Sequence, residues 1–261
     1  MVDAVRRHFA SLGLKASSGP FYSRSAMLRP TLAVAFALLC VTTRAQNPES
    51  SLAGEVQGRT YISPTGAFKV TIPVLPELGG SVTDTPNVVT FQDEFNTHVS
   101  IAAFAQDATQ HWEMTTRGLK DYLIYFFTNF VLSDFKQAFK GTQIESAKFV
   151  PGLYDGSLIT SILLPGGSMF ADKAPRFSED SPPPVAKRGN LLFVKNGHIF
   201  VLSVELAEKV LEGTAYKKTV AEEDEILRQR LTDVAGKIQF TRPPATTPAL
   251  TPPPGIAAPK K

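Results

Sequence analysis

The chain of 261 residues carries 27 Lys and Arg against 24 Asp and Glu, a formal net charge of +3, and one cysteine, Cys40. Residues 1–45 hold six of the basic residues, one acidic residue and Cys40, so residues 46–261 carry 21 basic and 23 acidic side chains, a net charge of −2. That balance argues against a nucleic-acid partner. The lack of cysteine after residue 45 excludes a disulfide or a thiolate metal site there.

An uninterrupted apolar run covers residues 32–41. It is ten residues long, whereas a membrane-spanning helix needs about 20. Arg24 and Arg29 precede the run, and Thr43-Arg44-Ala45 supplies small residues at the two positions that a signal peptidase reads. These flanks predict a secretory signal peptide at residues 27–45, cleaved after Ala45. A buried core helix is the alternative interpretation.

Residues 1–26 need a separate interpretation. Their arginines and serines also fit an organellar transit peptide, and Arg6-Arg7 resembles the start of a twin-arginine export signal. We favour translation from Met27, which makes residues 1–26 a non-native or disordered extension. A lipid anchor on Cys40 is a further alternative, although Leu39 is larger than the residue that normally precedes a lipidated cysteine. We therefore expect an exported protein, periplasmic or extracellular, with no stable membrane span after cleavage.

The rest of the chain divides into three parts. Residues 46–58 are polar and are expected to form a flexible linker, and residues 59–241 are expected to form a single α+β domain. Residues 242–261 contain seven prolines, which predicts a Pro-rich disordered tail. A spacer is the favoured role for this tail, and a proline-rich ligand segment is the alternative.

The first half of the domain contains strands and then a helix. Residues 67–72 alternate apolar and polar side chains and end at Pro73, and residues 88–91 and 99–104 are also typical of strands, with a turn at 93–97. The period then changes, which predicts a helix over residues 114–131. Its apolar stripe consists of Leu119, Tyr122, Leu123, Phe126 and Phe130. Two more strands are predicted at residues 143–150 and 153–164.

The second half contains the clearest local signals. Asn196-Gly197 lies between two apolar runs within residues 191–204, which predicts a hairpin with a type I′ turn. Because both runs are nearly continuous, we expect this hairpin to be central and covered on both faces. Thr219 and Glu222 form a capping box that begins a helix over residues 219–235. Its predicted buried stripe is Val220, Leu227, Leu231 and Val234, and a short strand follows at residues 238–240.

Residues 165–188 are too long for an ordinary connection and contain Gly166-Gly167 and three consecutive prolines. A mobile insertion is favoured over a binding loop, because the polar stretches offer few anchors.

Candidate chemical groups are few. The candidate metal ligands are His98, His111 and Glu113. The sequence has no HExxH or calcium-loop motif that would support a metal site. His198 is expected at the mouth of the hairpin. The other candidates are also weak. Ser157 and Ser168 lack the second glycine of a nucleophile elbow, and Asp93-Glu94 lies at a predicted turn. The aromatic stripe fits core packing better than a ligand pocket; it consists of Tyr122, Phe126, Phe127 and Phe130. We therefore predict no catalytic, cofactor-binding or metal-binding residue.

One stretch carries a resemblance to a known family. Residues 61–73, YISPTGAFKVTIP, resemble the opening of PsbP-like domains, and the middle helix, the hairpin at Asn196-Gly197 and the last helix followed by residues 238–240 match the layout of that superfamily. The resemblance implies an α+β fold in which an antiparallel sheet is sandwiched by two main helices, 114–131 and 219–235. The family includes extrinsic photosystem subunits, a Ran-binding nuclear-import factor and bacterial periplasmic proteins, so the fold does not specify a function.

We expect an exported, non-enzymatic accessory or binding protein of the cell envelope. It is expected to be a monomer whose partner is an envelope protein or a small ligand. Two alternatives remain open. One is a hydrolase-like enzyme that uses His98, His111 and nearby acids, and the other is a structural envelope protein tethered by the tail at residues 242–261.

Overall fold

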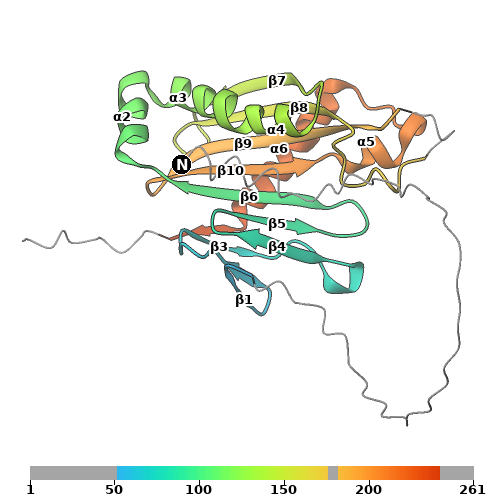
Figure 1. The fold of residues 1–261 in the computed structure, drawn as a ribbon, viewed down its shortest axis with the longest axis horizontal. Coiled ribbons are helices and arrows are strands. Elements are labelled where there is room, and N and C mark those ends of the chain that lie inside the picture. Colours follow the sequence, from blue (N-terminus) through green and yellow to red (C-terminus); the bar gives the residue numbers. More distant parts are fainter. Residues whose placement is uncertain (1–51, 176–181, 242–261) are drawn as a thin grey trace, which may run out of the picture.

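A seven-stranded antiparallel sheet forms the centre of the computed structural model, which describes residues 52–175 and 182–241 (Figure 1). In spatial order its strands are β4 (Ser81–Thr85), β5 (Val88–Gln92), β6 (His98–Ala105), β10 (His198–Glu205), β9 (Val185–Lys195), β8 (Ser157–Pro165) and β7 (Gln143–Val150). A smaller antiparallel sheet has the order β1 (Glu55–Gln57), β2 (Thr60–Ile62), β3 (Phe68–Thr71) and β11 (Ile238–Phe240).

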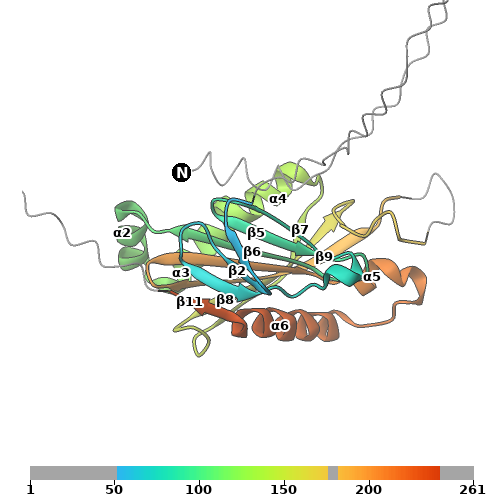
Figure 2. The same ribbon diagram turned by 90° about the horizontal axis from the view of Figure 1, so that it is seen from below.

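Helices cover both faces of the large sheet. One face is covered by α3 (Leu119–Phe126), a π-helical turn (Phe127–Val131) and α4 (Leu132–Ala138). The opposite face is covered by α6 (Val220–Gly236) and by the small sheet, as the view in Figure 2 shows. The remaining helices of the described residues are α2 (Ala108–Arg117), α5 (Ala207–Leu211) and two 3-10 turns, η1 (Pro76–Leu78) and η3 (Gly213–Ala215). The sequence prediction of an α+β fold with a sheet between two main helices is therefore confirmed.

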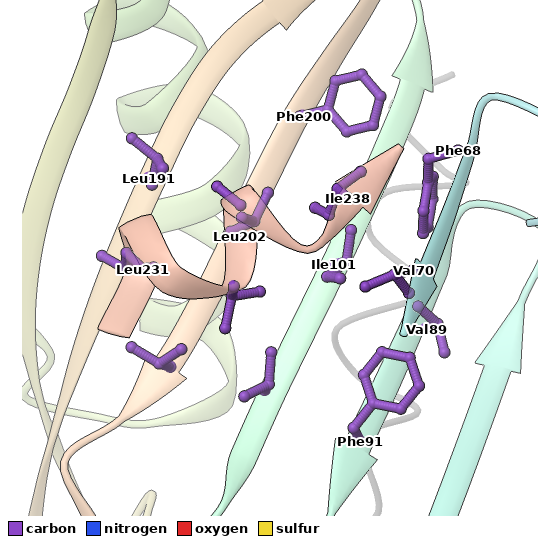
Figure 3. Close-up of a cluster of buried hydrophobic side chains, with 14 of the residues drawn as sticks. Phe68, Val70, Val89, Phe91, Ile101, Leu191, Phe200, Leu202, Leu231 and Ile238 are labelled. Carbon is purple, nitrogen blue, oxygen red and sulfur yellow. The ribbon is translucent and has the colours of Figure 1, made fainter. Parts of the chain in front are cut away.

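The core on the α6 side joins the two sheets and the helix. Figure 3 shows Phe68 and Val70 of β3 and Ile238 of β11 opposite the strands of the large sheet. Leu231 of α6 lies on the other side of this cluster, close to Leu191. Successive strand residues point to opposite faces. In β9, Leu191 consequently belongs to this core, whereas Leu192 belongs to the core under α3 and α4. The central hairpin is covered on both faces, as its continuous apolar runs predicted.

Two local sequence signals are confirmed at atomic detail. Asn196 and Gly197 have φ angles of 48° and 73°, the positive values that a type I′ turn requires. At the start of α6, Thr219 Oγ1 accepts a hydrogen bond from Glu222 N at 3.4 Å, and Glu222 Oε2 accepts one from Thr219 N at 2.7 Å. The capping box therefore fixes the first turn of α6 where the sequence placed it.

The helical region between β6 and β7 differs from the prediction of one helix over residues 114–131. It begins at Ala108 and ends at Ala138, and it breaks at Gly118, whose φ of 81° ends α2 and begins α3. The predicted burial of Val220 is also wrong. This side chain is 49% exposed because it occupies the first position of α6, one turn before the helix reaches the sheet.

Several strand boundaries also differ. Strand β1 lies inside the predicted linker at residues 46–58, strand β4 was not predicted, and β8 begins at Ser157 rather than at residue 153 because Tyr154 and Asp155 form a turn with positive φ. Strand β9 begins at Val185, so Lys187 and Arg188 are strand residues rather than part of the loop predicted at 165–188. The predictions for residues 1–26, 27–45 and 242–261 concern segments outside the described residues.

Candidate ligand-binding site at the end of the sheet

The histidines and the acid singled out in the sequence do not come together. His98 is the first residue of β6, whereas His111 and Glu113 lie on α2, beyond the other end of that strand. Seven residue steps of strand span about 23 Å. Glu113 forms an ion pair with Arg117 one helical turn away. Within residues 52–175 and 182–241, no group of three or more His, Cys, Asp or Glu side chains is placed to hold a metal ion.

The other polar candidates have structural contacts. His198, at the start of β10, has Nδ1 at 3.1 Å from Asn196 O beside the hairpin turn. Ser157 Oγ donates to Leu153 O at 2.6 Å, and Ser168 Oγ donates to Glu205 Oε1 at 2.5 Å. Asp93 Oδ1 accepts hydrogen bonds from the N–H groups of residues 95, 96 and 97, which shapes the turn between β5 and β6.

The aromatic side chains of the middle helix lie in the core. Tyr122, Phe126 and Phe127 are buried against the large sheet, and Phe130 packs on Phe126 with ring centroids 4.9 Å apart. These side chains are in contact with the core of the sheet, so the aromatic stripe packs α3 and the π-helical turn against the sheet.

Three buried polar side chains lie next to one another where β6, β10 and β9 reach the same end of the sheet. Arg188 of β9 is paired in register with Glu205 of β10. The ladder between β6 and β10 ends at the pair Val99 and Val204, so His98 and Glu205 are the next residues on their strands. His98, Glu205 and Arg188 are each at most 4% exposed.

Glu205 is the centre of this buried group. Its carboxylate accepts hydrogen bonds from Ser168 Oγ at 2.5 Å, from Met169 N at 3.2 Å and from Arg188 Nη2 at 3.2 Å. The Arg188 guanidinium also lies over the Phe135 ring of α4, with Cζ 6.0 Å from the ring centroid. The loop after β8 and helix α4 therefore enclose an ion pair that burial would make unfavourable without these additional contacts.

His98 is held in its neutral form. Burial is the main cause that lowers its pKa well below the usual value, and the positive charge of Arg188 lowers the pKa further. Neither ring nitrogen of His98 has a hydrogen-bond partner in the described part of the chain. Burial lowers the pKa of Arg188 overall, although the charge and hydrogen bond of Glu205 oppose this effect. The guanidinium stays charged because arginine is not deprotonated in proteins.

A cleft opens beside this group, between the turn at residues 93–97 and the last turns of α6. We call it the sheet-end cleft. It has a volume of about 290 Å³, and its lining includes His98 and Glu205. Its other polar lining residues are Asn96, Thr97, Arg230, Asp233 and Lys237. Arg230 is already engaged, because both of its terminal nitrogens contact the carboxylate of Glu208 at 2.7 and 3.1 Å.

Exposed apolar side chains border the cleft. Leu75 is 44% exposed, Leu78 is 40% exposed and Phe95 is 57% exposed. A hydrogen bond from Glu94 N to Leu78 O, 3.3 Å long, holds the turn that carries Phe95 against η1. Asn96 of the cleft directly follows Phe95, and Pro73 of the cleft lies two residues before Leu75, so we call these three exposed side chains the apolar rim of the cleft. One end of the sheet thus combines the buried charged pair, the sheet-end cleft and the apolar rim.

Arg188 and Glu205 escaped prediction because their pairing depends on the register of two strands. Arg188 followed three prolines and a lysine, which favoured a loop interpretation. A usable signal was present, since Ala186, Arg188, Asn190 and Leu192 share one face of β9 and lead into the apolar run.

Comparisons with known proteins assign no function to this chain. No family model and no curated protein matches the chain. The solved structures found include the cyanobacterial PsbP of Synechocystis, at 12% identity and a TM-score of 0.43 over 72% of this chain and 98% of that chain. They also include the Ran-binding protein Mog1p of Saccharomyces cerevisiae, at 9% identity and a TM-score of 0.42 over 74% of this chain and 97% of that chain.

A third structure comes from Bacteroides thetaiotaomicron, with 12% identity and a TM-score of 0.37 over 72% of this chain; the match spans half the length of that protein. PsbP, whose domain family the sequence resembles, and Mog1p are thus among the structures found. Identities of 12% or less and these low TM-scores carry no argument about site residues or partners.

Proposed function

We propose that this chain is an exported, non-enzymatic accessory or binding protein of the cell envelope, and that its partner binds at the sheet-end cleft. One observation carries the proposal: the cleft lies directly beside the exposed apolar rim of Leu75, Leu78 and Phe95. Exposed apolar groups gathered next to a hollow are typical of interaction sites.

The size of the cleft favours a protein partner. A volume of about 290 Å³ is at the lower limit for small-molecule pockets. It suits one inserted side chain of a partner whose neighbouring residues contact the rim. Phe95 is then the expected anchor, because aromatic side chains contribute most to protein interfaces. Asp233 and Lys237, on the wall formed by α6, supply polar contacts around it.

The export part of the proposal rests on the signal peptide at residues 27–45. Among the described residues, no helix is both long enough and apolar enough to cross a bilayer. N-terminal mass spectrometry of the exported protein is expected to show a chain that begins at Gln46. A peptide from residues 1–26 in that material would contradict our choice of Met27 as the start, and a chain that keeps residues 27–45 would contradict cleavage.

Crosslinking tests the binding surface. A photoreactive amino acid at Asn96 in the cleft is expected to crosslink to a defined envelope protein in the producing cells, whereas the same group at Trp112 on α2 gives no such adduct. Trp112 is a matched control because it is an exposed aromatic residue, 62% exposed, at the far end of β6.

Substitution of the anchor then separates the cleft from the rest of the surface. With the purified partner, Phe95→Ser is expected to weaken binding at least tenfold, a change typical of an interface anchor, and Trp112→Ser to leave it unchanged. Equal crosslinking from positions 96 and 112, or equal affinities for the two serine variants, would count against the cleft as the binding site.

A further inference from the structure

A row of five polar residues crosses the middle of the large sheet. The neighbouring strands β5, β6, β10, β9 and β8 contribute one residue each, and each residue is paired in register with the next. In that order, the row is Thr90, Ser100, Ser203, Asn190 and Thr160. All five are buried on the face that α3 and α4 cover. The next row towards the hairpin turn is entirely apolar and consists of Val88, Ala102, Val201, Leu192 and Leu158.

The outer members of the polar row satisfy one another. Thr90 Oγ1 and Ser100 Oγ are 3.1 Å apart, and Asn190 Nδ2 donates to Thr160 Oγ1 at 3.3 Å. The centre of the row is different. Ser203 Oγ and Asn190 Oδ1 have no hydrogen-bond partner among the described residues, although these two residues are directly opposite each other in the ladder.

The neighbouring row adds further unpartnered atoms on the same face. Alternate residues of a strand share a face, so His98 lies beside Ser100, and Arg188 beside Asn190. Both ring nitrogens of His98 and Nε of Arg188 have no partner in the described chain. Five polar atoms from four residues, each residue at least 96% buried, therefore collect on one patch of the sheet.

Such a collection is unusual in a folded protein. Buried polar groups are normally hydrogen-bonded, because leaving one without a partner costs free energy. The same sheet face accommodates a fully apolar row one step away, so packing alone does not require polar residues at these positions. The patch is enclosed by α4, whose Phe135 lies over Arg188, and by the loop after β8, whose Ser168 donates a hydrogen bond to Glu205.

We propose that His98, Arg188, Asn190 and Ser203 form an interior binding site for a small uncharged polar molecule that carries both a carbonyl oxygen and an N–H group, such as a primary amide. The carbonyl accepts hydrogen bonds from Arg188 Nε and the Ser203 hydroxyl, and the N–H group donates to Asn190 Oδ1. The ligand is uncharged because Glu205 already balances Arg188, and an ionised ligand would bring an unpaired charge into the interior.

This site is distinct from the surface where we place the protein partner, although the two adjoin. His98 and Glu205 also line the sheet-end cleft, so the cleft is the side from which we expect a ligand to enter the interior site. The chemistry of the site does not depend on the apolar rim. Loss of partner binding in a Phe95 variant and loss of ligand binding in a Ser203 variant are therefore separate observations.

Three isosteres that differ in charge test the proposal with the full chain. Acetamide is neutral, acetate is an anion and acetamidinium is a cation of the same shape. Titration with acetamide is expected to shift the NMR signals of the His98 ring in a saturable way, and acetate and acetamidinium are expected to shift them less. Ser203→Ala is expected to weaken acetamide binding about tenfold, the effect of one lost hydrogen bond.

Ser157→Ala provides the matched control. Ser157 is a fully buried serine on the α6 side of the sheet, so its loss should leave acetamide binding unchanged. Ser203→Ala removes a hydroxyl without a partner and is expected to fold. The absence of any saturable shift with acetamide indicates a site filled by water alone and overturns the proposal, as does a larger response to either ion. Unchanged binding in Ser203→Ala overturns the role of that hydroxyl.

Discussion

Lys187 of β9 places its ammonium nitrogen 3.0 Å from Glu223 Oε2, which joins the start of β9 to the first turn of α6. Both side chains are almost completely buried. Asp224 Oδ1 lies 2.8 Å from the same nitrogen, Glu145 of β7 also contacts it, and Lys209 of α5 pairs with Glu223 at 2.5 Å. Burial alone would lower the pKa of Lys187, but the hydrogen bonds that its ammonium donates to Asp224, Glu145 and Glu223 raise it overall.

Removal of Lys187 should destabilise the fold strongly. Lys187→Met keeps the length of the side chain but leaves the buried Glu223 with Lys209 as its remaining cation, and breaking a buried pair costs about 3–5 kcal/mol. Because Lys209 stays in place, we expect a loss of about 3 kcal/mol in the free energy of unfolding, measured by urea denaturation. Lys187→Met combined with Glu223→Gln should cost less than the sum of the single changes, and strict additivity would contradict coupling between the two residues.

The turn that carries Phe95 should depend on Asp93. Its Oδ1 accepts backbone hydrogen bonds from residues 95, 96 and 97 at 2.8–2.9 Å. Hydrogen bonds to a charged group contribute about 1.5–3 kcal/mol, so Asp93→Ala is expected to cost about 2 kcal/mol at neutral pH. The same change should weaken partner binding at the cleft, because the turn positions Asn96 and Thr97.

The pH dependence supplies an independent check on Asp93. Burial would raise its pKa, but the backbone hydrogen bonds, that from Thr97 foremost, lower it overall. A lowered carboxyl pKa stabilises the fold above the unfolded value, and this contribution disappears as the pH falls through the folded value. The stability difference between the wild type and Asp93→Ala should therefore shrink below about pH 4. A difference that stays constant down to pH 2 would show that charge on Asp93 plays no part.

Local patterns predicted much of the fold, because their causes are local. The type I′ turn needs two residues that tolerate positive φ, and Asn196-Gly197 provides them; the capping box needs Thr219 and Glu222 three residues apart. The candidate site depends on residues far apart in the sequence. Ser168 and Glu205 are 37 residues apart, and the polar row needs the register of five strands, which no single segment specifies.

Residues 185–188 show how composition misleads when charge is buried. Lys and Arg are rarely buried without a partner, so Lys187-Arg188 after three prolines favoured a loop. The two side chains point to opposite faces of β9, where Lys187 meets the acids of β7 and α6, and Arg188 meets Glu205. Their partners come from other strands and from α6, so the sequence around residues 185–188 does not identify them.

His98 should make stability fall as the pH drops below its ordinary pKa near 6.5. Burial, and then the charge of Arg188, lower its folded pKa well below that value, so the unfolded chain binds a proton that the folded chain does not. The free energy of unfolding should then decrease by about 1.4 kcal/mol per pH unit in this range. His98→Leu should remove that slope, and His111→Ala, on the exposed helix α2, should keep it. The same slope in His98→Leu as in the wild type would contradict this account.

Gly189 of β9 should be required for the close approach of α6. A Cβ atom added at this position would lie 3.0 Å from Leu227 Cβ and 3.2 Å from Leu231 Cδ1, closer than ordinary van der Waals contact. Because Gly189 lies in the centre of the sheet, Gly189→Val can be relieved only by moving α6 away from β9. Overpacking of this kind typically costs about 1–3 kcal/mol. A matched control is Gly152→Val, since Gly152 lies in a turn where an added Cβ meets no atom within 4 Å.

We expect thermal or urea denaturation to show a lower free energy of unfolding for Gly189→Val and little change for Gly152→Val. The Lys187 ion pairs provide a second readout, because a displaced α6 should weaken the coupling between Lys187 and Glu223. Full stability in Gly189→Val, with the coupling unchanged, would show that α6 does not pack on β9 as closely as described.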